Sequence, residues 1–199
     1  MKKGFIASIM VSIIAVAFCC APAAQATEET AFSKSLGKAS AGDAEAQFYA
    51  GVSYLTGSDG NAKDSVKARE WFEKAAAQSH TQAMAQLAKL YENGEGVEQD
   101  YKKAFELYEK SAMLGEEIAQ SGIGKLYFFG RGCEKNLVKS YAYATMSGST
   151  DEAALESIKF LFDGKLSDAE LAEAKNLAGK LRAEAAKNKA GAGNKNVKK

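Results

Sequence analysis

One short pattern of residues recurs along this chain at a fixed spacing, and that period constrains the fold more than any other feature. Asp64, Asp100 and Asn136 stand 36 residues apart, and a lysine follows each of them at the third position. Periods of about 20 to 50 residues are typical of proteins that stack one supersecondary unit on the next. We therefore expect a stack of helical pairs.

The register of the repeat holds at many other positions, which common residues would not readily match by chance. The first copy is one residue longer than the others between its two glycines, Gly57 and Gly60, where a loop absorbs an insertion at little cost. The aligned sets are Tyr54, Tyr91 and Tyr127; Gly57, Gly94 and Gly130; Gly60, Gly96 and Gly132; Lys67, Lys103 and Lys139; Ala68, Ala104 and Ser140; and Ala46, Ala83 and Ala119.

The second copy shows how the first helix of a unit is built. Ala83, Leu87, Leu90 and Tyr91 recur at the spacing of the apolar stripe of an amphipathic helix. The segment 93–96, Asn-Gly-Glu-Gly, predicts the end of this helix, because Asn and Gly accept the left-handed conformation that closes a helix.

The second helix of the same copy is predicted over residues 101–114. Asp100 precedes it as an N-cap, since its carboxylate can accept from the free amides of the first turn. Gly115 is expected to end it. Small residues are expected where two helices cross closely, and large ones beside them. The predicted packing positions are Ala104, Phe105, Tyr108 and Ala112.

The pattern continues beyond the three copies at both ends. Residues 30–41 resemble a leading second helix, and residues 151–162 a degenerate first helix. Ser167 and Glu170 form a capping box, flanked by Leu166 and Leu171 as a hydrophobic staple, and they predict a terminal capping helix over 167–186. The composition of residues 187–199 predicts a disordered basic tail.

These elements predict an all-α protein of antiparallel helix pairs, about three and a half repeats of an α-solenoid with a C-terminal capping helix. The expected organisation is a helical repeat domain over 27–186, with repeats at about 44–80, 81–116 and 117–150 and a half-repeat at 151–164.

The first 26 residues predict export. Two lysines are followed by a short apolar run and an Ala-x-Ala site that ends at Ala26, which is the pattern of a cleaved secretory signal. We therefore expect a periplasmic or secreted protein. Cleavage removes Cys19 and Cys20 and leaves Cys133 as the single cysteine, so no internal disulfide can form and packing must hold the fold. The remaining alternatives for Cys133 are a partly buried thiol or an intermolecular disulfide.

The sequence around the second copy resembles the Sel-1-like repeat, a relative of the tetratricopeptide repeat. The resemblance rests on residues 87–91, 94–97, 100–101, 103–104 and 110–112, and on Trp71 with residues 74–76, and it extends over roughly residues 39–165. It implies a right-handed superhelix that scaffolds protein complexes, with the first helix of each pair on the concave face. The third copy departs from the pattern at Cys133, Asn136 and Ser140.

By the same resemblance, a protein or peptide partner would contact the first helix of each copy. The alternative for the apolar members of this set, Phe48, Val52, Ile118 and Phe128, is that they belong to the core. The implied contact residues are Glu45, Phe48, Val52, Gln82, Lys89, Glu92, Ile118, Ser121, Lys125 and Phe128.

The residues needed for catalysis are sparse, and we expect neither an enzyme nor a cofactor or metal site. His80 is the only histidine and lies in a turn between units, and one cysteine with one histidine cannot form a zinc site. Some exported members of the resembled family are rich in cysteine and bind or hydrolyse β-lactams, which makes such an enzyme the alternative function. This chain lacks their paired cysteines.

The charge distribution bears on the kind of partner. The tail 187–199 holds five lysines and no acid, and the chain between the signal and the tail has 19 basic against 25 acidic residues. An acidic body repels nucleic acid, so we expect no nucleic-acid partner. The lysine tail is expected either to solubilise the protein or to contact anionic surfaces weakly.

Overall fold

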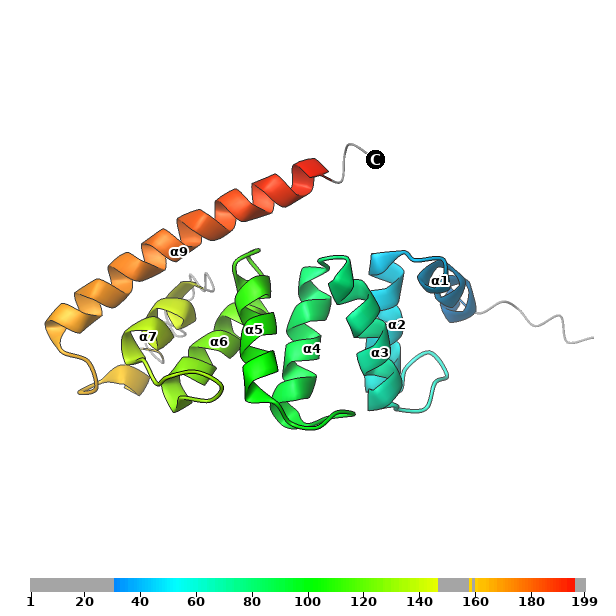
Figure 1. Ribbon diagram of the computed structural model, residues 1–199, viewed down its shortest axis with the longest axis horizontal. Coiled ribbons are helices and arrows are strands. Elements are labelled where there is room, and N and C mark those ends of the chain that lie inside the picture. Colours follow the sequence, from blue (N-terminus) through cyan, green and yellow to red (C-terminus); the bar gives the residue numbers. More distant parts are fainter. Residues whose placement is uncertain (1–30, 147–157, 159, 196–199) are drawn as a thin grey trace, which may run out of the picture. The chain divides into compact units, whose positions relative to one another are not determined.

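The computed structural model describes residues 31–146, 158 and 160–195 of the 199-residue chain. All regular secondary structure in these residues is α-helical, as the sequence predicts. The helices in chain order are α1 (Ala31–Ser40), α2 (Ala44–Thr56), α3 (Ser65–Ala77), α4 (Thr81–Asn93), α5 (Tyr101–Ala112), α6 (Glu117–Phe129), α7 (Leu137–Met146) and α9 (Asp168–Lys195) (Figure 1).

Three helix pairs form the body of the protein: α2 with α3, α4 with α5, and α6 with α7. Each pair packs on the next through the neighbouring helices α3 and α4, or α5 and α6 (Figure 1). The predicted stack of antiparallel helix pairs is therefore confirmed. Such a stack buries apolar surface only when neighbouring units are present, since one pair alone cannot cover its own apolar side.

The predicted N-caps of the second helices are present in all three pairs. Asp100 accepts hydrogen bonds from the backbone N–H groups of Lys102 and Lys103, both at 3.0 Å. Asp64 caps α3 in the same way, and Asn136 accepts from the N–H of Lys139 at 2.8 Å. These bonds satisfy amides that the helix itself leaves free, which explains the recurrence of Asp or Asn at this position.

In each unit the recurring glycine ends the first helix, and a backbone hydrogen bond to the recurring tyrosine joins the end of the loop to that helix. Gly94 has a φ of +72° and its N–H donates to the carbonyl of Leu90, which ends α4. After the loop, the N–H of Asp100 donates to the carbonyl of Tyr91 at 2.9 Å. The other units repeat this connection from Asp64 to Tyr54 and from Asn136 to Tyr127.

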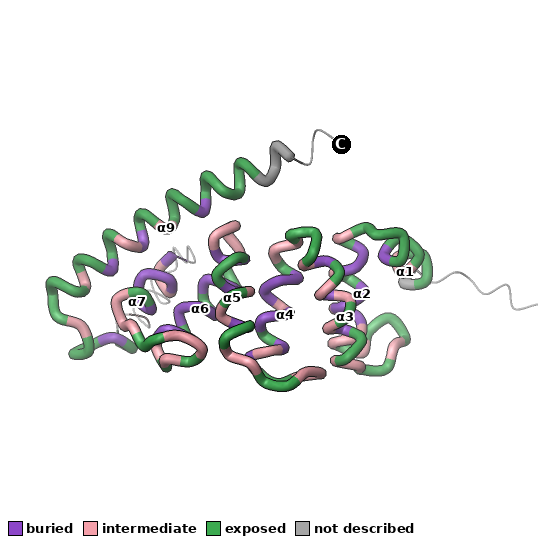
Figure 2. Tube along the Cα trace, in the orientation of Figure 1, coloured by how far each residue is buried: buried purple, intermediate pink, exposed green. Residues whose placement is uncertain are grey.

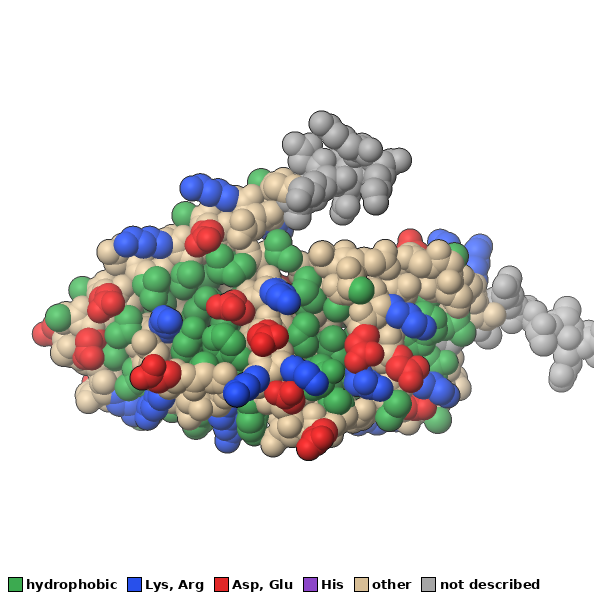
Figure 3. Space-filling model, viewed as in Figure 1, with side chains coloured by type: hydrophobic (Ala, Val, Ile, Leu, Met, Phe, Trp, Pro, Cys, Tyr) green, Lys and Arg blue, Asp and Glu red, His purple; other side chains and the backbone are tan. Residues whose placement is uncertain are grey.

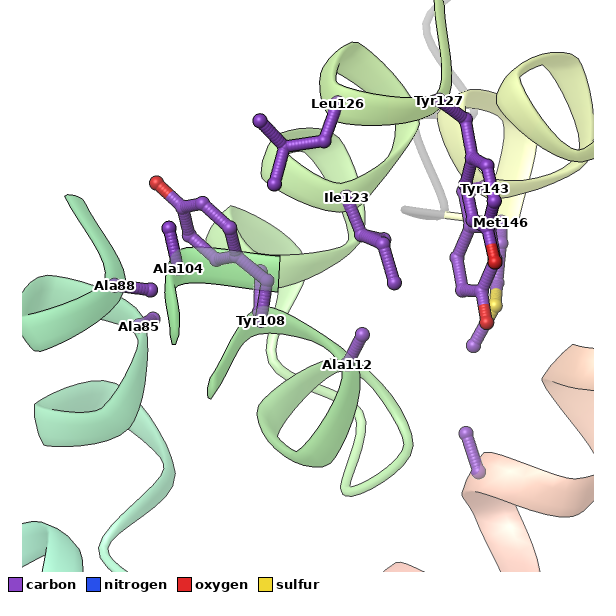
Figure 4. Close-up of a cluster of buried hydrophobic side chains, with 12 residues drawn as sticks. Ala85, Ala88, Ala104, Tyr108, Ala112, Ile123, Leu126, Tyr127, Tyr143 and Met146 are labelled. Carbon is purple, nitrogen blue, oxygen red and sulfur yellow. The ribbon is translucent and has the colours of Figure 1, made fainter. Parts of the chain in front are cut away.

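The buried segments of the tube lie where helices face one another (Figure 2). They form the core of the stack in apolar clusters, two of which share the half-buried side chains of Tyr91 and Leu107. Phe72, Leu90, Ile123 and Leu126 are its largest fully buried side chains. Figure 4 shows Tyr108 of α5 among small residues and Ile123 and Leu126 of α6. The alanines with no exposed surface at helix contacts are Ala68, Ala75, Ala83, Ala85, Ala88, Ala104, Ala112, Ala119, Ala142 and Ala174.

The capping box predicted at the start of the last helix is present. Ser167 N–H and its hydroxyl both donate to the Glu170 carboxylate, at 2.8 and 2.7 Å. Leu166 and Leu171 pack in the same apolar cluster, as a staple requires.

Helix α9 differs from the expectation at its other end, because it continues to Lys195 instead of losing structure at Lys187. Composition alone misses tertiary contacts, and one of these lies in the added segment: Asn188 donates to the carbonyl of Met113 at 3.1 Å. Ala and Lys also favour helix intrinsically. Most of the expected helix over 151–162 lies outside the described residues, although residues 160–162 are helical.

None of the described helices has the length and hydrophobicity needed to cross a lipid bilayer. The expected signal segment 1–26 lies outside the described residues.

Candidate functional site

The first helix of each pair leaves one stripe of side chains at the surface. The exposed or half-buried positions on α2, α4 and α6 recur every three to four residues, so they lie on one side of each helix. We call this surface the first-helix face. Its residues are Glu45, Tyr49, Val52 and Thr56 of α2, Gln82, Gln86, Lys89 and Asn93 of α4, and Ile118, Ser121, Lys125 and Phe129 of α6.

The structure sorts the ten predicted contact residues into three groups by exposure. Three of them, Phe48, Val52 and Phe128, are half-buried in apolar clusters, and Glu92 is buried. The exposed members are Glu45, Gln82, Lys89, Ile118, Ser121 and Lys125.

Two of the predicted residues, Glu92 of α4 and Lys125 of α6, are joined directly. The Glu92 carboxylate is only 5% exposed, and its Oε1 lies 2.6 Å from Nζ of Lys125. Its other oxygen accepts a 3.0 Å hydrogen bond from the hydroxyl of Tyr108 on α5. Burial, together with the neighbouring Glu92 charge, raises the pKa of Tyr108. This three-residue network ties the second unit to the third with both carboxylate oxygens satisfied.

The preceding junction, between the first and second units, is built without such a network. Phe72 stands at the repeat position of Tyr108, is fully buried, and lies against Gly51, where an added Cβ would come within 2.5 Å of the ring. Leu55 stands at the position of Glu92 and packs in the same cluster. Lys89, at the position of Lys125, therefore faces no buried acid and is exposed, with no ion-pair partner among the described residues.

Glu45 and Phe48 meet at the turn before α4, around His80. The Phe48 ring stacks on the imidazole with centroids 4.9 Å apart, and Nε2 of His80 lies 2.9 Å from Oε2 of Glu45. Nδ1 of His80 accepts a hydrogen bond from the N–H of Ala83, so this histidine caps α4. Both ring nitrogens thus have polar partners within the protein, as a structural role for His80 requires.

Reasoning from the sequence missed two exposed aromatic residues of the first-helix face. Tyr49 is 56% exposed and Phe129 is 55% exposed, whereas their chain neighbours Phe48 and Phe128 turn inward. The signal was present in the helical spacing, because Tyr49 lies four residues after Glu45, and Phe129 lies four after Lys125. A contact set built by strict helical spacing would have included both.

The remaining reactive groups do not converge. Burial raises the pKa of the half-buried Cys133 thiol, which leaves it protonated at neutral pH and weakly nucleophilic. Among the described residues, no three His, Cys, Asp or Glu side chains are grouped as metal ligands would be. The surface of Figure 3 mixes acidic and basic side chains and exposes apolar ones between them.

Comparison with known proteins places the helix pairs in a family. The Sel1 repeat model matches residues 44–80, 81–116 and 118–149, which is more than half of the chain. A Sel1 repeat protein from Oxalobacter formigenes is 30% identical, with a TM-score of 0.55, over 63% of this chain and 95% of that one.

A second solved structure is similar in fold. It is c5321, described as a protective antigen of uropathogenic Escherichia coli strains, and it is 23% identical with a TM-score of 0.57. The match covers 80% of this chain but 42% of that longer one. No protein of curated function matches the sequence.

Proposed function

Since the chain belongs to the Sel1 repeat family, whose members are generally protein-interaction scaffolds, we propose that it is a non-catalytic scaffold that binds a protein or peptide partner. The proposed binding site is the first-helix face. The observation that carries this proposal is the pair of large apolar side chains, Tyr49 and Phe129, that α2 and α6 hold at the surface. Neither fills a core position, and exposed aromatic residues are enriched in protein interfaces.

Contacts between the helices that carry this face support the same proposal. The Glu92–Lys125 ion pair joins α4 to α6, and the two helices contact each other directly. A surface held in one arrangement loses little conformational entropy on binding. A partner is therefore expected to meet a preformed surface.

The proposed function is tested by partner capture with two matched variants. One carries Tyr49→Glu and Lys89→Glu on the first-helix face. The other carries Val66→Glu and Lys110→Glu on the second helices α3 and α5, where both side chains are also exposed. We expect the first variant to lose specific partners from a cell-envelope extract and the second to keep them. A folded first variant that retains every partner would exclude this face as the site.

Substitution of Phe48 or Phe128 is less suitable for this test. Phe48 packs against Phe72 and His80, and Phe128 packs edge-on against Phe162. A glutamate at either position would place a charge in an apolar cluster and would confound lost binding with lost stability.

We also propose that the protein is exported and that its signal is removed after Ala26, which the sequence of residues 1–26 supports. The mass of the protein recovered from the producing cell tests this directly. A mature chain starting at Thr27 is expected, and a retained N-terminus would contradict it.

The rival enzymatic function predicts turnover of nitrocefin by the purified protein, and we expect none.

A further inference from the structure

Arg131, in the loop between α6 and α7, is held between two aromatic rings. Its guanidinium carbon lies 5.3 Å from the ring centre of Tyr101 and 5.0 Å from that of Phe129. Both contacts lie within the range of cation–π interactions. These contacts favour one position of the guanidinium, while the side chain as a whole stays exposed.

The repeat itself does not require any of these three residues. At the position of Arg131 the other units have Ser58 and Glu95. Ser65 and Leu137 stand at the position of Tyr101, and Thr56 and Asn93 at that of Phe129. The preceding junction, which has Glu95 and Ser65 in place of Arg131 and Tyr101, still forms the same helices and caps. The cluster therefore occurs at one place in the stack, and the structural requirements common to all units do not explain it.

The charge of Arg131 is not neutralised by the surrounding protein. No carboxylate in the part of the chain that the structure describes lies within ion-pair distance of its guanidinium. Lys102 and Lys135, next to Tyr101 and within the same loop, are exposed cations, and Glu134 is the one acid in that loop. Asp100, the acid beside Tyr101, is already paired with Lys103 at 3.7 Å.

The cluster is continuous with the first-helix face. Phe129 lies one helical turn after Lys125, which is half exposed and uses its ammonium on the Glu92 carboxylate. An ammonium has three donors, so two remain for a second acceptor. Lys89 adds an exposed cation on α4 that has no ion-pair partner in the described part of the chain. Lys89 and Lys125 therefore add two cationic side chains to the first-helix face, of which Phe129 is also a member.

We propose that this corner binds an acidic segment of a partner protein, one whose glutamate or aspartate carboxylates pair with Arg131 and whose apolar side chain covers Phe129. The planar guanidinium matches a carboxylate with two parallel hydrogen bonds, and its prior fixation between rings reduces the entropy lost on binding. This inference rests on the proposed function, since it names the chemistry of the partner for the same face.

The experiment uses a fluorescein-labelled peptide of Glu-Glu-Leu repeats and measures its anisotropy with the purified protein. We expect saturable binding that weakens about tenfold with Arg131→Glu and about threefold with Arg131→Lys, which keeps the charge but not the planar fork. Lys110→Glu, the same charge change on α5, is the matched control and should change binding less than about twofold. The peptide with glutamine in place of glutamate should not bind.

The outcomes separate the inference from the proposed function. Absent binding of the glutamate peptide, equal binding of the glutamine peptide, or equal weakening by Arg131→Glu and Lys110→Glu would each overturn the acidic partner. Partners captured through Tyr49 and Lys89 but not displaced by the glutamate peptide would overturn it too, while leaving the scaffold function standing. Circular dichroism of each variant confirms that the helices are intact.

Discussion

The ammonium group of Lys103 lies 5.3 Å from the centre of the Tyr91 ring. The same pair recurs as Lys67 over Tyr54 at 5.3 Å and as Lys139 over Tyr127 at 5.2 Å. The tyrosine in the last turn of the first helix and the lysine in the first turn of the second are therefore in contact across the loop. This contact gives a physical reason for two of the aligned positions in the repeat, since each pair fixes the path between its helices.

Lys103→Met is expected to lower the free energy of unfolding by about 0.5 to 1 kcal/mol, because it removes the cation–π contact with Tyr91 and the 3.7 Å ion pair with Asp100 while keeping an apolar stem. Lys102→Met is the control, since this neighbouring lysine is exposed and, among the residues that the structure describes, is not paired with a ring or an acid. Urea unfolding of the two variants measures the difference. Equal losses would show that the tyrosine contact adds nothing to stability.

Removing one member of the buried network of Glu92, Tyr108 and Lys125 is expected to destabilise the protein more than replacing all three. Lys125→Met alone should destabilise the protein by about 1 to 3 kcal/mol, because the buried Glu92 carboxylate loses its ion-pair partner. The triple variant Glu92→Leu, Tyr108→Phe and Lys125→Met gives this junction the leucine and phenylalanine of the preceding one and also removes the lysine, so it should recover most of that loss. A triple variant less stable than Lys125→Met would contradict the comparison of the two junctions.

Substitution of alanine for the repeated glycines is expected to destabilise the protein by different amounts at different positions. Gly96 has a φ of +69°, and a Cβ there would come within 2.5 Å of the carbonyl carbon and oxygen of Ser65. Gly60 has a φ of +80° but open space around it. Gly60→Ala should therefore cost about 1 kcal/mol for its backbone conformation, and Gly96→Ala about 2 to 4 kcal/mol because the α3 backbone must also move. Thermal or urea unfolding distinguishes these values, and similar losses would argue against the close packing.

Alkaline pH is expected to weaken the fold through its buried tyrosines. Burial raises the pKa of Tyr143 to about 12, and the pKa of Tyr108 is raised too. The unfolded chain releases these protons near pH 10, so stability is unaffected below about pH 10 and falls between about pH 10 and 12. The expected slope is about 1 kcal/mol per pH unit for each tyrosine.

Tyr143→Phe should flatten this decline, and Tyr49→Phe, at an exposed position, should not. Urea midpoints at a series of pH values measure both, and absorbance of the ionised phenol follows the titration itself. An identical decline in the two variants would show that Tyr143 is not the group responsible.

Local features of the fold were predictable because they depend on residues close together in the chain. The caps at Asp64, Asp100 and Asn136 act on amides two or three residues away, and the glycine ends of the first helices close within one turn. The stripe containing Ala83, Leu87 and Leu90 follows from helical spacing in the same way. The repeat then makes stacking necessary, since each unit exposes apolar surface that only a neighbour can cover.

The candidate site was predictable only in part. The resemblance to the Sel-1-like repeat assigned the partner contacts to the first helices, but it selected Phe48 and Phe128 where the structure exposes Tyr49 and Phe129. Which side of an aromatic-rich helix faces water depends on the helices packed against it. That information lies in contacts such as Phe128 with Phe162, which are far apart in the sequence.

The sequence by itself determined the helix pairs, their ends and the order in which they stack, because hydrogen bonding and apolar spacing act over a few residues. Tertiary structure alone decided that Glu92 is buried against Lys125 and Tyr108, that Arg131 is fixed between Tyr101 and Phe129, and that α9 continues to Lys195. Each of these depends on groups from different helices meeting at distances of a few ångströms. A repeat period fixes which units are neighbours, but not which side chains those neighbours bring into contact.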